Sequence, residues 1–151
     1  MRRLADSLFV LALTLWVGGL WAIGFIAAPS LFAALKDRVL AGELAGNLFV
    51  LMAWVGMACA AYLLAYLAVC RGWAVLGSWL FWLLLAMLVL TLASHFGIQP
   101  ILAQLKAEAW PRSVMESALK SRFATWHGVA SGLYVLQSLF GAAAVLLQRK
   151  G

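Results

Sequence analysis

Long apolar stretches alternate with short polar ones along this chain, and all formal charges fall in the polar stretches. The charged residues leave four uncharged windows, at residues 7–35, 44–70, 72–105 and 123–148. A helix needs about 20 apolar residues to cross the roughly 30 Å hydrocarbon core of a bilayer, and each window is longer than that. The pattern therefore predicts an all-α integral membrane four-helix bundle, with helices at about residues 5–28, 45–69, 74–98 and 123–147.

The composition supports this class of protein. Hydrophobic residues make up 66% of the chain and charged residues 11%, whereas about a quarter of a soluble domain is charged. The longest polar stretch between windows, residues 106–122, is too short to form a soluble domain. We therefore expect residues 1–151 to form one transmembrane domain.

The net charge of +6 is spread over the termini and loops rather than over one basic face. This distribution indicates the lipid bilayer, not a nucleic acid, as the partner. Five Lys and Arg residues lie on one predicted side of the membrane and six on the other. The count alone leaves the orientation open, but Arg2, Arg3 and Arg71 flank helix ends directly, which favours cytoplasmic termini.

The first and third windows share the spacing F-x-x-x-P-x-L, at residues 25–31 and 96–102. The shared spacing suggests two related helical hairpins placed in parallel. Because proline cannot donate a backbone hydrogen bond and clashes with the preceding turn, we expect these helices to kink and end at Pro29 and Pro100. Short amphipathic helices at the membrane interface are expected after the prolines, at residues 30–38 and 101–116.

Small residues recur at helix-contact spacing around Gly18 on the first helix and at Gly128 and Gly132 on the fourth. Such spacing lets helices approach closely in a membrane. We expect these glycines to pack the bundle internally, and a homodimer seam is the alternative.

His95 and His127 are the only side chains in the windows that titrate near neutrality. At 100° per residue, His127 shares one helix face with Ser131 and Tyr134, and His95 shares another with Gln99. Because the third helix ends and the fourth begins on the same side, we expect both histidines near the non-cytoplasmic interface. These five residues form the candidate pocket.

Two imidazoles at one level suit a transition metal such as copper, or haem iron. The preferred interpretation is a binding protein that holds a small ligand or a transition metal in this pocket. Three alternatives stay open: a haem- or quinone-linked redox protein, a structural or assembly partner, and histidines that satisfy helix-end carbonyls and bind nothing.

Several activities lack the residues that they require. The four windows hold no carboxylate, Lys or Arg, which argues against an ion-coupled pump. The sequence has no HExxH, GxSxG, GxGxxG or Walker motif, so hydrolase, dehydrogenase and nucleotide-binding functions are unsupported. A non-enzymatic role is favoured.

Three segments carry a family resemblance: Gly24-Phe25 running into Pro29-Ser-Leu-Phe32, Ile98-Gln-Pro100, and Arg122-Phe-x-x-Trp-His-Gly-x-x-Ser131. With these segments the chain resembles the small four-helix membrane proteins, a domain of unknown function, related to eukaryotic transmembrane protein 205. The resemblance covers nearly the whole chain and implies a four-helix bundle in a bacterial inner membrane, with no activity assigned. A weaker likeness, in size and interfacial histidines, is to membrane families that handle copper or haem intermediates.

Overall fold

A computed structural model describes residues 2–109 and 113–148, and within them every regular element is helical. The elements follow in the order α1 (Arg2–Trp21), η1 (Ala22–Ala27), α2 (Ala28–Ala34), α3 (Arg38–Arg71), η2 (Gly72–Gly77), α4 (Trp79–Leu92), η3 (Ala93–Ile98), α5 (Gln99–Ala109), η4 (Val114–Glu116) and α6 (Lys120–Leu147). Segments η1 and η3 are π-helical, and η2 and η4 are 3₁₀-helical.

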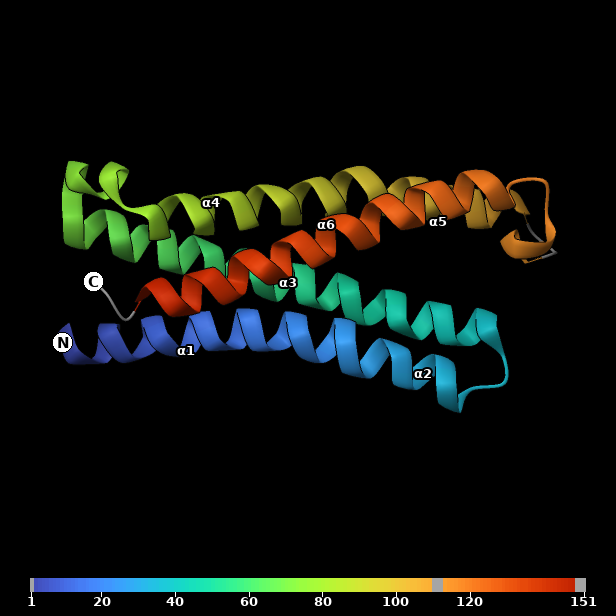
Figure 1. The fold of residues 1–151 in the computed structure, drawn as a ribbon, viewed down its shortest axis with the longest axis horizontal. Helices are drawn as coiled ribbons and strands as arrows, with labels where there is room; N and C mark the ends of the chain where they lie inside the picture. Colours follow the sequence, from blue (N-terminus) through green and yellow to red (C-terminus); the bar gives the residue numbers. More distant parts are fainter. Residues whose placement is uncertain (1, 110–112, 149–151) are drawn as a thin grey trace.

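These elements join into four long rods (Figure 1). The rods run over Arg3–Ala34, Arg38–Gly77, Trp79–Ala109 and Lys120–Leu147, and each is long and apolar enough to cross a membrane. Helix α1 packs on α3, α3 on α4, α4 on α6, and α6 on α1, so the rods form a closed ring. The prediction of an all-α four-helix bundle is confirmed.

Neither proline ends its helix, which differs from the sequence expectation. The rod that contains Pro29 continues to Ala34, and the rod that contains Pro100 continues to Ala109. The segments after the prolines, α2 and α5, therefore continue their rods rather than forming separate helices, although α2 turns away from the direction of α1 (Figure 1).

A π turn before each proline explains this continuity. The N–H of Ala28 bonds to the carbonyl of Ile23, and the N–H of Gln99 bonds to that of Ser94, each five residues back. The wider turn changes which carbonyl faces the proline ring, so the clash that breaks an α-helix is relieved. Local π geometry also re-satisfies backbone groups that proline would free in an apolar surrounding.

The two π turns are structurally equivalent. Segments η1 and η3 each contain six residues and end two positions before their proline. The same geometry at the same place in the first rod of each hairpin supports the interpretation of the fold as two related halves.

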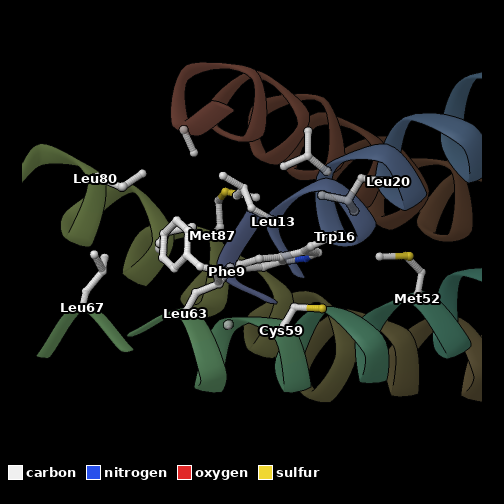
Figure 2. Close-up of a cluster of buried hydrophobic side chains, with 14 of the residues drawn as sticks. Phe9, Leu13, Trp16, Leu20, Met52, Cys59, Leu63, Leu67, Leu80 and Met87 are labelled. Carbon is white, nitrogen blue, oxygen red and sulfur yellow. The ribbon is translucent and has the colours of Figure 1, made fainter. Parts of the chain in front are cut away.

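The centre of the bundle is packed tightly around Trp16 of α1 (Figure 2). Trp16 is fully buried, and its indole lies directly against the backbone of Gly56 on α3. Gly19 makes a similar close approach to Met52. Small residues at such contacts bring helices close enough for dispersion to hold them together.

The close approaches involve other glycines than those expected from sequence. A Cβ added at Gly18, Gly128 or Gly132 would meet no atom within 4 Å among the described residues. On α6 the close contact is instead at Gly141, where a Cβ would lie 3.1 Å from the methyl groups of Val17. The spacing of small residues thus identified α1 and α6 as packing helices but not the faces that pack.

Replacing Gly56 by Ala should destabilise the bundle, because the new Cβ would overlap the indole of Trp16, which has no free space to move into. Overpacking of a buried contact costs about 1–3 kcal/mol. The measurement is thermal unfolding of the detergent-solubilised protein. The matched control is Gly18→Ala, where a Cβ meets open space; equal melting temperatures for the two variants would contradict the packing assigned to Gly56.

Candidate functional site

A buried polar pair links α4 to α6. The Nε2 of Gln137 donates to Oγ1 of Thr91 at 2.8 Å, and this hydroxyl donates to the carbonyl of Met87 at 2.9 Å. Both side chains are buried. Because a buried polar group is costly unless it is paired, this hydrogen bond fixes the register of the two antiparallel helices. Sequence reasoning missed Gln137, although a single amide within an apolar span was a signal for it.

Tyr134, a predicted pocket residue, docks α6 onto the first π turn. Its ring lies so close to Gly24 that a Cβ on that residue would overlap it. Its hydroxyl donates to the carbonyl of Leu20 at 2.6 Å. One turn further along α6, the indole of Trp21 donates to the carbonyl of Ser138 at 3.3 Å. Tyr134 is therefore engaged in holding α6 to η1.

His95 lies in the second π turn, η3, among aromatic rings. Its ring makes T-shaped contacts with Trp54 and Phe96, with ring centroids 5.3 and 4.7 Å away. Trp54 is 56% exposed and Phe96 is 59% exposed, so this aromatic cluster opens outward between α3 and η3. The Nδ1 atom of His95 is buried and has no hydrogen-bond partner among the described residues.

His127 has a different environment near the start of α6. It is exposed, and its ring stacks on Phe123 with centroids 5.8 Å apart. Its carbonyl accepts a hydrogen bond from the exposed Ser131 at 2.9 Å. Gln99 is half-buried, and its backbone N–H closes η3.

The two histidines differ in depth along the bundle. The Thr91–Gln137 hydrogen bond sets the register of α4 against α6. From that level, His95 lies four residues onward and His127 ten residues back on the antiparallel helix. At 1.5 Å per residue these distances are roughly 6 and 15 Å, an offset of about 9 Å.

The predicted pocket residues consequently divide between different surroundings. Tyr134 faces η1, His95 faces α3, and His127 stacks on its own helix. Within residues 2–109 and 113–148, no group of three or more His, Cys, Asp or Glu side chains could hold a metal ion.

Each π turn is covered by one aromatic side chain from the other hairpin. Aligning Pro29 with Pro100 places Gly24 opposite His95, because each lies five residues before its proline. In the first half Tyr134 of α6 covers Gly24, and in the second half Trp54 of α3 packs on His95. The two halves thus repeat one arrangement with different chemistry.

A separate apolar groove of about 330 Å³ lies on the outer side of α4 and touches none of the predicted site residues. Its lining consists of Trp82, Leu85, Ala86, Val89, Leu90 and Phe140.

One comparison with known proteins finds a match. The family described as a domain of unknown function (DUF4149) matches residues 11–111. This range includes both proline-containing π turns, Trp54 and His95, and it ends before α6. No curated protein and no solved structure matches the chain.

Replacing Tyr134 by Phe should lower the stability of the bundle, because the substitution removes the hydrogen bond to Leu20 while keeping the ring over Gly24. The expected loss is about 0.5–1.5 kcal/mol, measured as a lower midpoint of thermal unfolding in detergent. Ser131→Ala is the control, since that hydroxyl is exposed and bonds only within its own helix. An unchanged midpoint for Tyr134→Phe would show that the hydroxyl does not contribute.

Proposed function

The chain belongs to the DUF4149 family, a domain of unknown function, and we propose that it is an integral membrane protein that binds a small ligand at His95. Four long apolar rods and many exposed large hydrophobic side chains support insertion into a bilayer. The sequence resemblance to relatives of transmembrane protein 205 supports a bacterial inner membrane, and the flanking arginines support cytoplasmic termini.

The observation that carries the proposal is the buried Nδ1 atom of His95, which has no hydrogen-bond partner in residues 2–109 and 113–148. A buried polar atom without a partner costs about 1–3 kcal/mol, and a ligand that bonds to it offsets this cost. The atom lies in a π turn, a geometry that recurs at functional sites, and it belongs to the deepest ionisable side chain of its rod. Trp54 and Phe96 beside it provide an apolar surface for the body of the ligand.

The geometry supports a small ligand better than a metal ion or haem iron shared by both histidines. One ion would need the two ring nitrogens within about 4 Å of each other, twice a metal–nitrogen bond of about 2 Å. The offset of about 9 Å along the bundle works against this arrangement. We therefore assign binding to His95, with Gln99 one turn after it, His127 and Ser131 outside the immediate site, and Tyr134 as a packing residue of the other half.

His95→Ala should remove the bound molecule, whereas His127→Ala should retain it. The measurement is mass spectrometry and elemental analysis of mildly solubilised, purified protein, with an absorption spectrum to detect haem. Loss of about tenfold or more is expected in His95→Ala, because the ligand loses both its hydrogen bond and part of the aromatic cluster. Retention in His95→Ala, loss in His127→Ala alone, or an empty wild-type protein would contradict the assignment.

A second candidate function, assembly with a second copy of the chain, is favoured by the open space beside Gly128 and Gly132 on α6. Two such helices would meet through these glycines, as small residues allow in membranes.

Gly132→Leu should weaken this self-association by blocking the close approach of two α6 helices, while leaving the fold intact because the position is open within one chain. Cross-linking in membranes and the mass of the detergent-solubilised particle measure it. Leu139→Ala, at an exposed apolar position further along α6, is the control. A wild-type protein that is monomeric in both measurements would rule out this candidate.

A further inference from the structure

The two halves of the bundle differ at one chemically important place. In the first half, a phenol ring covers the π turn, and its hydroxyl bonds to the backbone of the first rod, from Tyr134 to Leu20. In the second half, the indole of Trp54 covers the corresponding turn and brings no hydroxyl. The imidazole of His95 occupies the position that corresponds to Gly24, and its Nδ1 atom lacks a partner within the described residues.

The Nδ1 atom of His95 restricts which chemical group of a ligand can bond to it. A neutral imidazole nitrogen is either a donor or an acceptor, according to the tautomer. A hydroxyl is both, so it can pair with Nδ1 in either state. The windows at residues 44–70 and 72–105 place no formal charge on the helix segments that carry Trp54 and His95, which favours a neutral hydroxyl over a phosphate or carboxylate head group.

The surrounding rings restrict the body of the ligand. Trp54 and Phe96 stand nearly perpendicular to His95, at 73° and 83°, and both are more than half exposed. Aromatic edges and faces in such an arrangement favour a further aromatic ring, edge-to-face or offset. The cluster opens away from the bundle, where a membrane-soluble molecule would reach it. Nδ1 is buried, so binding requires the imidazole to turn about its soft terminal torsion and present Nδ1 to this opening.

We propose that the ligand of His95 is a membrane-soluble phenol or quinol. Its ring lies against Trp54 and Phe96, and its hydroxyl donates a hydrogen bond to the unprotonated Nδ1 of His95, in the tautomer that carries its proton on Nε2. The ligand thus supplies to the second half the phenolic group that Tyr134 supplies to the first. This inference rests on the proposed binding function and names the chemical class of the molecule bound.

Titration of the full-length protein in nanodiscs with 2,3-dimethoxy-5-methyl-6-decylbenzoquinol, kept reduced, tests the proposal. Tryptophan fluorescence reports binding, and because the chain has eight tryptophans, the part of the signal change that is lost in Trp54→Phe is the part assigned to Trp54. The bis-O-methyl ether of the same quinol is the matched control ligand, since it keeps the ring and tail but cannot donate. We expect saturable quinol binding that weakens about five- to tenfold for the ether and in His95→Phe, which keeps an aromatic ring but lacks the nitrogen. Tyr134→Phe should leave binding unchanged.

Equal affinity for the quinol and its ether, or unchanged affinity in His95→Phe, would overturn the proposal, as would the absence of saturable binding to the wild type. These results are separable from failure of the proposed function. If His95→Ala loses the molecule that copurifies with the wild type while quinol and ether bind alike, binding at His95 is supported and the phenol or quinol class of the ligand is contradicted. If His95→Ala retains that molecule and quinol does not bind, both the His95 site and the ligand class are contradicted.

Discussion

Each half of this bundle must carry a proline inside a long helix without breaking it. A helix in an apolar surrounding cannot leave backbone groups exposed, because no water is present to pair with them. The π turns before Pro29 and Pro100 meet this requirement, and both rods continue past the proline. Tyr134 of α6 packs against the first of these turns and His95 lies in the second, so the positions of both side chains depend on how the prolines are accommodated.

The two halves share a π turn before a proline but differ in the side chains at that turn. In the first half Gly24 makes room for the ring of Tyr134, whose hydroxyl donates to the carbonyl of Leu20, just before the turn. In the second half His95 takes the corresponding position, packs on Trp54 and Phe96, and has an Nδ1 atom with no hydrogen-bond partner in the described part of the chain. Under the proposed function, the first half serves as a scaffold and the second half binds the ligand.

The interpretation of the polar residues shows where helical periodicity helps and where it stops. Periodicity placed His127, Ser131 and Tyr134 on one face of the fourth helix. Tyr134 meets η1, but His127 and Ser131 lie further toward the start of α6 and are exposed. His95 was grouped with them because the third and fourth helices meet at one end of the bundle, yet it faces Trp54 of α3. Gln137, which pairs with Thr91 between α4 and α6, lies off that face, so periodicity around His127 does not indicate it.

By itself, the sequence determined the helical class, the number of long helices and the relation between the two halves. These properties follow from where charge is absent and from the repeated proline spacing, which are local along the chain. Only the tertiary structure decided that the prolines continue their helices, that Gly56 rather than Gly18 packs closely, and that the two histidines differ in depth. Those outcomes depend on the register between helices, because contacts such as Trp16 with Gly56 and Gln137 with Thr91 join residues far apart in sequence, and periodicity within one helix carries no information about its neighbour.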